Sequence, residues 1–421
     1  MRFRTARAVA AVALAGSFMA VALPTVSPAG AAGLTVASFK SNYSTMFSST
    51  IQNIVKQIPG WAPNGAGTKL AIGVILPDEV TSTRYVEFDA PDLATAFTDA
   101  GLSTSEFNIQ NAQGSDATEI TDAQAMIANG AKVLLMDPLD ASTGASIEAA
   151  AAKAGVKVID YDRLTLGGSR QYYVSFNNVR VGQLIGQGLL SCITAWHVKK
   201  PVVYVMYGAT TDNNATLFGE GYNAVLKKAG YHPGEGAPST ANTINESTGT
   251  WTPSVALTDF QGAYSAHPNI NAVVTPNDEN AAPIISYLQS KGLKPKKIPF
   301  TGQDATLTGF QNILSGYQCG TVYKPIWLEA QAAATLAFYL AAGKTPPAGL
   351  VNGKTEDTVS HVAVPSVLLT PSWVTAPKIA STVIKDGVIN PVALCTNERP
   401  TVHGFRAPTY AQDCKTYKIA K

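Results

Sequence analysis

Carboxylate, amide and basic side chains follow one apolar run after another along this chain, each where the run ends. In VKVIDYDRL, at positions 156–164, a β-branched run leads into Asp160, Asp162 and Arg163. A buried strand has no use for such groups, so we expect them to serve a site at the end of the strand. Together they offer dense, charge-assisted hydrogen bonding to a polyol.

The same placement recurs at the other apolar runs. Beyond the carboxyl ends of parallel strands lies the ligand crevice of an open sheet, so these groups are predicted to converge on one site. For any single Asp or Asn, helix N-capping is the alternative, but Arg163, Gln303 and Lys324 are poor N-caps. The further strand-end residues are Asp78, Glu79, Asp137, Asp212, Asn213, Asn214, Asn277, Asp278, Gln303, Asp304 and Lys324.

Two aromatic residues adjoin polar loops instead of apolar runs. Tyr85 stands in STRY and Trp251 in TGTWTP. Such rings pack on the apolar faces of a pyranose, which would complete a sugar site. For Trp251 a hydrophobic plug between helix and sheet is the alternative interpretation.

The elements that must position these residues follow a rhythm of β-rich run, polar break, Ala-rich helical run and glycine. Strands are predicted over 69–76, 131–136, 156–160, 201–206, 271–275, 298–301 and 320–323. Helical runs end at Gly101, Gly130, Gly155, Gly230, Gly292, Gly316 and Gly343, where glycine supplies a left-handed residue. This order predicts an α/β fold with parallel sheets covered on both faces.

Length and charge limit the function classes. A chain of 421 residues suggests two lobes, and charged residues make up only 14% of it. The 31 basic and 29 acidic side chains nearly cancel, so there is no electrostatic footprint for nucleic acid or an anionic membrane. No CxxC or HxxxH spacing indicates a metal site, and GQGLLS around Gly186 is only a fragment of a dinucleotide fingerprint, which we interpret as close packing.

Residues 1–32 read as a signal peptide, with a basic start, an apolar stretch from Ala8 to Leu23 and small residues before a cleavage site. The expectation is an exported protein, extracellular or associated with the cell envelope. Residues 33–68 form an extension with a helix over 36–58 and a Pro/Gly-rich linker. The cysteines suit an oxidising compartment: Cys395 with Cys414 is the preferred pair, while Cys192 and Cys319 pair or stay separate.

Several segments together resemble the D-xylose-binding proteins that feed ABC sugar importers, within the type I periplasmic binding protein superfamily. They include VIDYDRL, YYVSFNNVRVGQ, TTDNNATLFGEG, TGQDATLTGFQNILSG and GTVYKP, and the resemblance runs from about Lys69 to Asn390. It implies two Rossmann-like lobes joined by a three-segment hinge, with crossings near Asn177, Gln303 and Val364. The first lobe would comprise 69–177 plus 304–363, and the second 178–303 plus 364–421.

Carried onto this chain, the resemblance implies a sugar-binding set. Arg84 would bond hydroxyls beside Tyr85, where the family usually has tryptophan. The other implied contacts are Asp162 and Arg163 from the first lobe, Asp212, Asn214, Trp251 and Asn277 from the second, and Asp304 and Lys324 near the hinge. The implied function is capture of a monosaccharide, D-xylose or a related aldose such as glucose or arabinose, by hinge closure.

The implied protein is a monomer that delivers its sugar to an ABC transporter permease, with no enzyme activity, no cofactor and no nucleic-acid partner. A secreted glycosidase using two of the carboxylates is one alternative. Against it, each carboxylate has a basic or amide partner in the predicted crevice that would keep it ionised. A receptor partner with a sensory role is a second alternative, and a sugar-responsive repressor would need a DNA-binding motif where the signal peptide stands.

Overall fold

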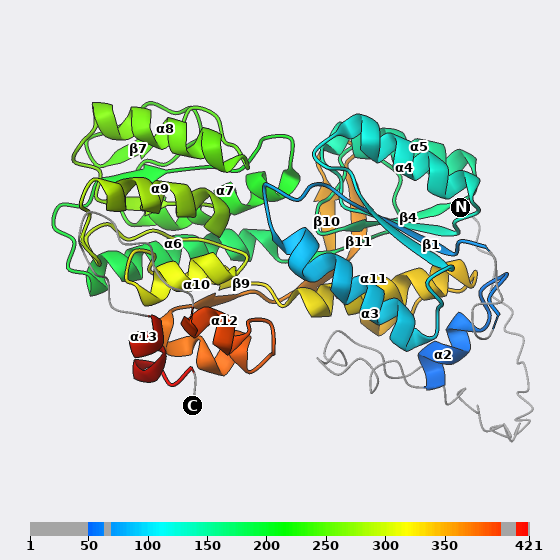
Figure 1. The fold of residues 1–421 in the computed structure, drawn as a ribbon. Helices are drawn as coiled ribbons and strands as arrows, with labels where there is room; N and C mark the ends of the chain where they lie inside the picture. Colours follow the sequence, from blue (N-terminus) through cyan, green and yellow to red (C-terminus); the bar gives the residue numbers. More distant parts are fainter. Residues whose placement is uncertain (1–48, 63–68, 397–409, 420–421) are drawn as a thin grey trace, which may run out of the picture. The chain divides into compact units, whose positions relative to one another are not determined.

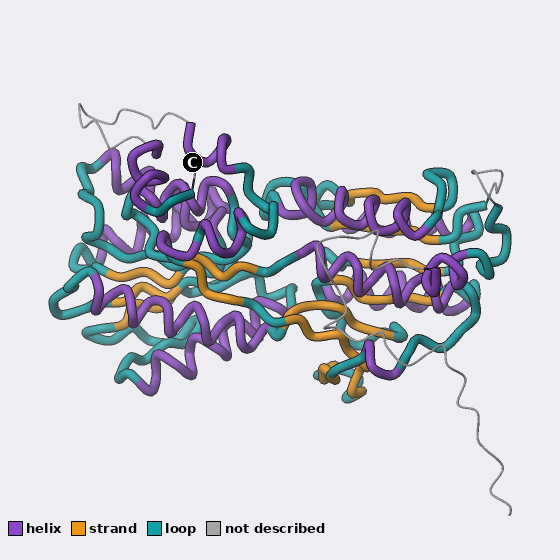
Figure 2. The backbone as a smooth tube through the Cα atoms, turned by 90° about the horizontal axis from the view of Figure 1, so that it is seen from below, coloured by secondary structure: helices purple, strands orange, loops and turns teal. Residues whose placement is uncertain are grey.

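Two sheets with helices on both sides form two lobes, called here the first and the second lobe (Figures 1 and 2). The computed structural model describes residues 49–62, 69–396 and 410–419. In the first lobe seven strands pair in the order β10-β11-β5-β4-β3-β1-β2. They are β1 (Ile72–Leu76), β2 (Phe107–Asn111), β3 (Val133–Met136), β4 (Lys157–Tyr161), β5 (Tyr172–Phe176), β10 (Gly353–Asp357) and β11 (Val362–Leu369).

Helices cover the two faces of this sheet, which explains why β1 and β3 are apolar and buried at every position. One pair of helices lies against β1 and β4, and the other pair lies on the opposite face, as Figure 1 shows. The first pair is α4 (Asp116–Ala128) and α5 (Ala141–Lys153), and the second is α3 (Ala90–Ala100) and α11 (Ile326–Ala341). Helix α2 (Ser49–Val55) packs on α3 and α11 and buries Ile51 and Val55.

The pairing in this sheet is parallel except between β10 and β11, and its register brings the strand ends together. Ile75 of β1 pairs with Met136 of β3, which in turn pairs with Asp160 of β4. The polar residues that follow these strands therefore share one edge of the sheet.

The second lobe is built on β7-β6-β8, which pair in parallel. Bridges from Val273 to Phe300 and from Gln303 to Val322 extend this sheet to β9, which pairs antiparallel with β12. The strands are β6 (Val203–Val205), β7 (Thr243–Asn245), β8 (Ala272–Val274), β9 (Thr321–Tyr323) and β12 (Ser372–Val374). The helices are α6 (Asn178–Ala195), α7 (Asn213–Lys228), α8 (Pro253–Ala266), α9 (Asp278–Ser290), α10 (Leu307–Leu314), α12 (Pro391–Thr396) and α13 (Tyr410–Thr416). Short turns complete the described chain: η3 (Tyr85–Asp89), η4 (Ala348–Leu350), η5 (Ala376–Lys378) and η6 (Ala380–Ile384).

The strand pairing corrects two of the three predicted lobe crossings. The first crossing lies at Asn177, between β5 of the first sheet and α6 of the second lobe. The predicted crossing near Gln303 is wrong, because residues 304–323 continue through α10 to β9 in the second lobe, and the chain crosses after Lys324. The crossing near Val364 is also wrong, because β11 stays paired with β5 as far as Leu369.

Close contact between α6 and α7 rests on glycine. A Cβ added at Gly182 would lie 2.0 Å from the Phe218 carbonyl oxygen, and one at Gly221 would lie 2.3 Å from the Val179 oxygen. At Gly186 the nearest atom would be Cβ of Val225, at 3.0 Å. The interpretation of the GQGLLS glycines as close packing is confirmed at Gly186, and an added Cβ at Gly188 would lie 2.5 Å from the Trp373 ring.

The α/β class and most of the predicted strands are confirmed. All seven glycines expected after helices have positive φ. The run 298–301 contributes only the bridge at Phe300. The signal peptide at 1–32 lies outside the described residues, as does most of the predicted helix over 36–58, of which Ser49–Val55 is seen.

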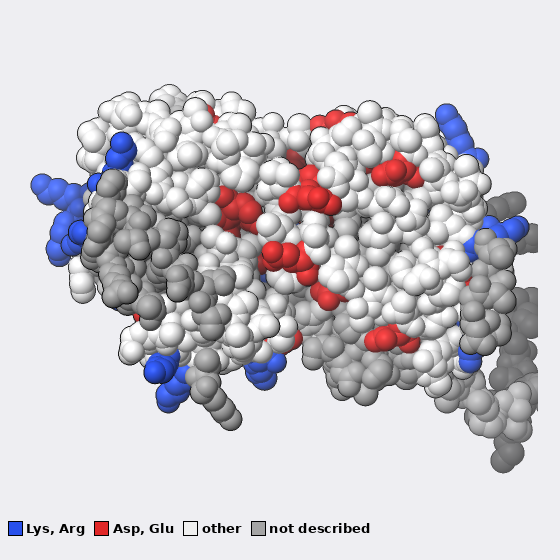
Figure 3. Space-filling model, in the orientation of Figure 1, with Lys and Arg blue, Asp and Glu red and all other residues white. Residues whose placement is uncertain are grey.

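The cysteine sulfur atoms lie in two pairs, Cys192 with Cys319 and Cys395 with Cys414. The first pair ties α6 to the segment before β9, and the second ties α12 to α13. Within the described parts of the chain, no helix is both long and apolar enough to cross a membrane. On the face in Figure 3, acidic side chains gather near the middle, whereas Lys and Arg lie mostly toward its ends.

Candidate functional site

Part of the predicted strand-end set converges on one cavity between the lobes, whereas the rest does not line it: Asp78, Glu79, Asp137, Asp160, Asn213 and Asp278. All ten residues of the implied sugar-binding set line it: Arg84, Tyr85, Asp162, Arg163, Asp212, Asn214, Trp251, Asn277, Asp304 and Lys324. The remaining lining comes from Thr81, Ser82, Phe218 and Gln303. Of these, Gln303 is one of the predicted strand-end residues, although it is not among the sugar contacts that the resemblance implies.

Arg84 is ion-paired with three carboxylates of the first lobe. Its guanidinium contacts Asp89 at 2.7 Å, Asp162 at 2.8 Å and Glu329 at 2.9 Å, and the residue is only 1% exposed. These contacts use most of its five N–H donors. Arg84 therefore fixes the Asp162 carboxylate at the cavity wall as well as lining the cavity itself.

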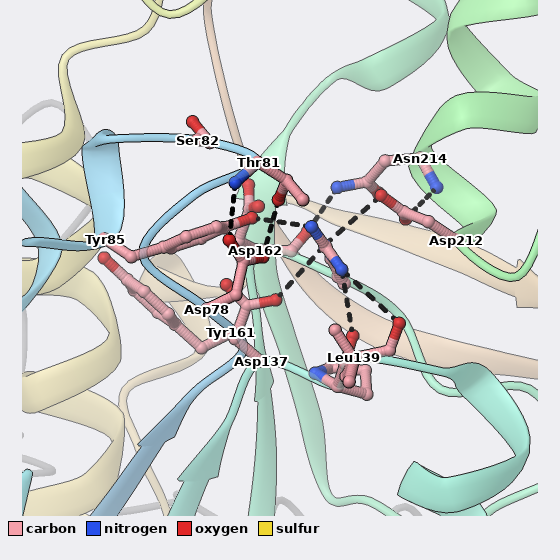
Figure 4. A network of polar contacts seen from close by, with 12 residues as sticks. Asp78, Thr81, Ser82, Tyr85, Asp137, Leu139, Tyr161, Asp162, Asp212 and Asn214 are labelled. Atoms are coloured by element: carbon pink, nitrogen blue, oxygen red, sulfur yellow. Dashed lines mark hydrogen bonds and ion pairs between the residues drawn. The ribbon is translucent and has the colours of Figure 1, made fainter. Parts of the chain in front are cut away.

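Arg163 reaches across the cleft to Asp212, and Figure 4 shows Tyr85 and Asp162 of the first lobe facing Asp212 and Asn214 of the second. One of its terminal nitrogens donates to the Tyr85 hydroxyl at 2.9 Å, which lies in the same lobe. Its Nε lies 3.2 Å from the Asp212 carboxylate of the second lobe. The guanidinium also lies 5.7 Å from the centre of the Tyr85 ring. Because this ion pair joins the two lobes, it is made only when they are close together.

The second lobe presents its groups from the start of α7 and from the loop before α8. Asp212 caps α7 by accepting from the Asn214 backbone N–H at 2.8 Å, and it also accepts from the Trp251 indole N–H at 3.0 Å. The Asn214 amide donates to the carbonyl of Asp162 at 2.9 Å. Capping and site membership are therefore both true of Asp212.

Trp251 also combines its two interpretations. Its ring fills the space above Gly208, where an added Cβ would lie 2.2 Å from the indole. It packs edge-on against Phe218 and lines the cavity. The indole is thus both a packed core group and part of the wall.

Asn277, Asp304 and Lys324 complete the wall. Asn277 caps α9 and donates to the Thr81 carbonyl of the first lobe at 3.3 Å. The ammonium of Lys324 lies 3.0 Å from Asp304 of the second lobe and 3.9 Å from Asp162 of the first. Lys324 directly precedes the second crossing, and its ammonium group lies near a carboxylate of each lobe.

Two of the site carboxylates stand on left-handed backbone. Asp162 has φ 58°, Asp304 has φ 86°, and Ala305 after it has φ 55°. Such conformations cost non-glycine residues about 1–3 kcal/mol each and persist where the surroundings over-determine them. The loop of Asp304 is held by the buried Asp278, which accepts from Thr306 N–H at 2.9 Å.

The carboxylates differ in how readily they ionise. Burial alone would raise the pKa of Asp162, but the charges of Arg84, Lys324 and Arg163 outweigh it and hold the pKa below its usual value. Burial raises the pKa of Asp212, although Arg163 opposes the shift. The expectation that partners favour the ionised form therefore holds for Asp162, whereas at Asp212 the effect of burial on the pKa outweighs the charge of Arg163.

The arrangement can hydrogen-bond a neutral polyol through both donors and acceptors. Three basic groups face three lining carboxylates, and the aromatic rings of Tyr85, Phe218 and Trp251 supply apolar surface. The free volume is about 20 Å³, room for roughly one water molecule, so a sugar is admitted only when the lobes move apart. Among the described residues no group of three or more His, Cys, Asp or Glu side chains could hold a metal ion.

Of the lining residues that were not predicted from the sequence, Phe218 could have been found from its spacing, whereas Thr81 and Ser82 could not. Phe218 lies four residues after Asn214, so helical spacing places it on the same side of α7. Thr81 and Ser82 lie in an irregular segment before η3, and no periodic pattern marks them.

Comparisons with known proteins agree with this geometry. The chain matches the family described as periplasmic binding protein domain over residues 72–345. The D-xylose-binding periplasmic protein of Escherichia coli (strain K12) is 35% identical over 281 residues, covering 66% of this chain and 80% of that protein. The multiple sugar-binding periplasmic receptor ChvE of Rhizobium radiobacter is 29% identical over 336 residues, 77% of this chain and 92% of that one.

A solved structure gives the same answer. The carbohydrate transporter solute binding protein from Chloroflexus aurantiacus, in complex with D-glucose, has a TM-score of 0.66 at 27% identity. The match covers 77% of this chain and 98% of the other. With the family match over most of both lobes, the chain belongs to the periplasmic binding protein family.

Proposed function

We propose that this protein captures a monosaccharide between its lobes and delivers it to an ABC importer. The observation that carries the proposal is the convergence of all ten implied contacts on one interlobe cavity. The relatives support it, because they are named for binding xylose or several sugars, and the Chloroflexus structure holds D-glucose. These relatives are sugar-binding proteins, which supports binding without catalysis.

Lobe closure around the sugar is the proposed mechanism. In the open form, Asp162, Arg163 and Tyr85 would meet the sugar first, and Asp212, Asn214 and Trp251 would complete its coordination as the lobes close. A ligand shifts the opening equilibrium only by contacts that the closed form makes better. The interlobe ion pair of Arg163 with Asp212 shows where closure brings charge together.

D-xylose is the proposed ligand, with glucose or arabinose as the aldoses to compare. The 35% identity to a xylose-binding protein favours xylose. The glucose complex of the Chloroflexus protein shows that a member of this family also accommodates a hexose. The lining residues offer hydrogen-bond donors and acceptors for hydroxyl groups that these sugars share, so the choice would rest on cavity shape around the ring.

The finer assignments are also proposals. We propose export by the segment 1–32, disulfide bonds at the two cysteine pairs, and a monomer that docks on a permease. The paired positions of the sulfur atoms and the periplasmic relatives support them. A purely sensory role, in which the closed form engages a receptor, is the second candidate and is supported by the relative named a receptor.

Calorimetric titration of residues 33–421 with free pentoses and hexoses tests the function. We expect one-to-one binding of an intact monosaccharide with a micromolar dissociation constant, which needs about −8 kcal/mol. A few hydrogen bonds to charged groups, at roughly 1.5–3 kcal/mol each, would suffice. Absence of binding across the panel, or turnover of a glycoside, would overturn the proposal.

A further inference from the structure

The first turn of α9 makes a contact between the lobes that stands apart from the sugar cavity. Glu279 of α9 accepts from the backbone N–H of Thr83 at 3.0 Å and from its hydroxyl at 3.3 Å. Thr83 belongs to the first-lobe segment 81–84, directly before η3. The contact therefore exists only while the lobes are together.

Neither partner of this contact lines the cavity, although the residues beside them do. Arg84 and Tyr85 follow Thr83 in the chain and form part of the cavity wall, as does Asn277 two residues before Glu279. A sugar in the cavity would touch Arg84, Tyr85 and Asn277 without reaching the Glu279 carboxylate. The contact can change the energy of closure without changing what the sugar meets.

Glu279 is not explained by the stability of the second lobe, because a buried carboxylate at this position does not stabilise that lobe by itself. One carboxylate oxygen of Glu279 has no hydrogen-bond partner among the described residues. Burial, followed by the nearby charges of Asp304 and Asp278, raises the pKa of Glu279. A second-lobe carboxylate in such surroundings is costly, and its hydrogen bonds at Oε1 go to the first lobe.

We propose that Glu279 is a positioning residue that fastens segment 81–84 to the second lobe and thereby sets the affinity for every sugar alike. This inference rests on the proposed sugar-binding function. The measured affinity includes the free-energy difference between the open form, which admits the sugar, and the closed form that holds it. A contact that favours the closed form multiplies every sugar's affinity by one common factor.

Titration of the Glu279→Ala variant against the same sugar panel tests the inference. We expect each affinity to fall by roughly 10-fold, the effect of losing both hydrogen bonds that Thr83 donates to Glu279. The ratio between any two sugars should stay within about twofold of the wild-type ratio, and dissociation should be faster. Glu279→Gln keeps an acceptor oxygen, so it should recover part of the loss.

Control variants separate the loss of the contact between Glu279 and Thr83, called here the latch, from a general loss of folded structure. Glu220→Ala removes an exposed carboxylate of α7 that does not line the cavity, and it should leave every affinity unchanged. Thr83→Ala removes only the hydroxyl contact, should cost less than Glu279→Ala, and serves if Glu279→Ala does not fold. Thermal unfolding without sugar shows that each variant is folded.

The outcomes are distinct. If the wild-type protein binds no sugar, the proposed function is wrong, and the inference about Glu279, which rests on it, is wrong as well. If the wild type binds but folded Glu279→Ala and Thr83→Ala both keep full affinity, only the latch is wrong. If Glu279→Ala changes the preference among sugars, Glu279 acts on the sugar itself and the latch is also wrong.

Discussion

Asp212 has three different kinds of partner in the candidate site. It caps α7, accepts from the Trp251 indole and faces Arg163 across the cleft. Such a residue couples the second-lobe aromatic wall to the first-lobe guanidinium. Its raised pKa makes this coupling sensitive to pH in a way that the depressed pKa of Asp162 does not allow.

Asp212→Asn tests that coupling. The amide keeps the shape but removes the charge opposite Arg163, and its NH₂ group opposes one of the present donors. We expect sugar affinity to fall by roughly 10- to 150-fold, equivalent to about 1.5–3 kcal/mol. In the wild type, affinity should fall as the pH drops through the raised pKa of Asp212, whereas the variant should lose this step. Calorimetry across a pH series measures both.

Tyr85→Phe isolates the hydroxyl that this chain has where its family usually has tryptophan. The ring remains, but Arg163 loses an acceptor 2.9 Å away. We expect about 10-fold weaker sugar binding, since a hydrogen bond to a charged group is removed and the guanidinium is less firmly placed. Tyr172→Phe, which changes a half-buried tyrosine at the start of β5, is the matched control and should bind normally. Equal affinities for the two variants would show that the ring alone matters.

Sequence reasoning reached the site residues because strand ends in a parallel sheet share one edge. It could find Asp162, Asp212 and Lys324 from that rule and from motif resemblance together. It could not find Thr81 or Ser82, because an irregular segment has no periodicity to reveal which side chains turn inward. Nor does the sequence reveal the direction of the pKa shift at Asp212, which depends on three-dimensional burial.

At the scale of elements, the glycines between α6 and α7 allow the second-lobe helices to touch. Gly182→Ala would place a Cβ 2.0 Å from the Phe218 backbone oxygen, which cannot move without α7. We expect a loss of about 1–3 kcal/mol or more in the free energy of unfolding. Gly262→Ala, in α8 with open space around it, should instead gain about 1 kcal/mol from helix propensity. Chemical denaturation of both variants gives the comparison.

Glu246 offers a pH test of the second lobe. It accepts from the Tyr207 backbone N–H at 2.7 Å, and burial raises its pKa to about 8. Between the unfolded pKa near 4.5 and the folded value, the folded state binds more protons, so stability falls as pH rises. Glu246→Gln removes this titration.

The variant should match the wild type near pH 4 and become progressively more stable than it up to pH 8. At about 1.4 kcal/mol per pKa unit, the full effect reaches several kcal/mol. Denaturation midpoints at both pH values measure it. A constant difference between the proteins across the range would mean that Glu246 is already ionised in the folded state.

Predicted elements matched the structure where apolar runs were long and bounded by glycine. β1, β3 and β4 are of this kind. β2, with the sequence FNIQN at the sheet edge, and the three-residue β7 escaped notice because each buries too little apolar surface to form a run. β10 and β11 form a hairpin at the opposite edge, where exposed residues alternate with half-buried ones in β10 and the first two residues of β11 are exposed.

For the whole molecule, the lobe crossings were the least predictable feature. Pairing partners decide them, and pairing is not local: Gln303 bridges to Val322, and Leu369 pairs with Phe176. Nothing in the residues around Gln303 or Val364 states which sheet they join. The first crossing was easier to place because a strand ends and a capped helix begins on either side of Asn177.

The two cysteine pairs should contribute unequally to global stability. Cys192 and Cys319 are 127 residues apart and Cys395 and Cys414 only 19. By the chain-entropy account, the longer loop stabilises by about 5 kcal/mol and the shorter by about 3. We expect Cys192→Ser with Cys319→Ser to lower the thermal midpoint more than the other double replacement, with sugar affinity unchanged in both. Calorimetric unfolding and titration test the two claims, and equal midpoints would contradict the first.

The late return of the chain to its first sheet also affects the order in which the protein can be made. β5 needs β11 as its outer neighbour, yet nearly two hundred residues separate them in sequence, including most of the second lobe. Until residue 369 has emerged from the ribosome, β5 has one unpaired edge, and α11 has yet to cover its face for most of that time. A nascent chain therefore carries an unpaired strand edge through nearly half of its synthesis, and protection by a chaperone has its clearest purpose during that interval.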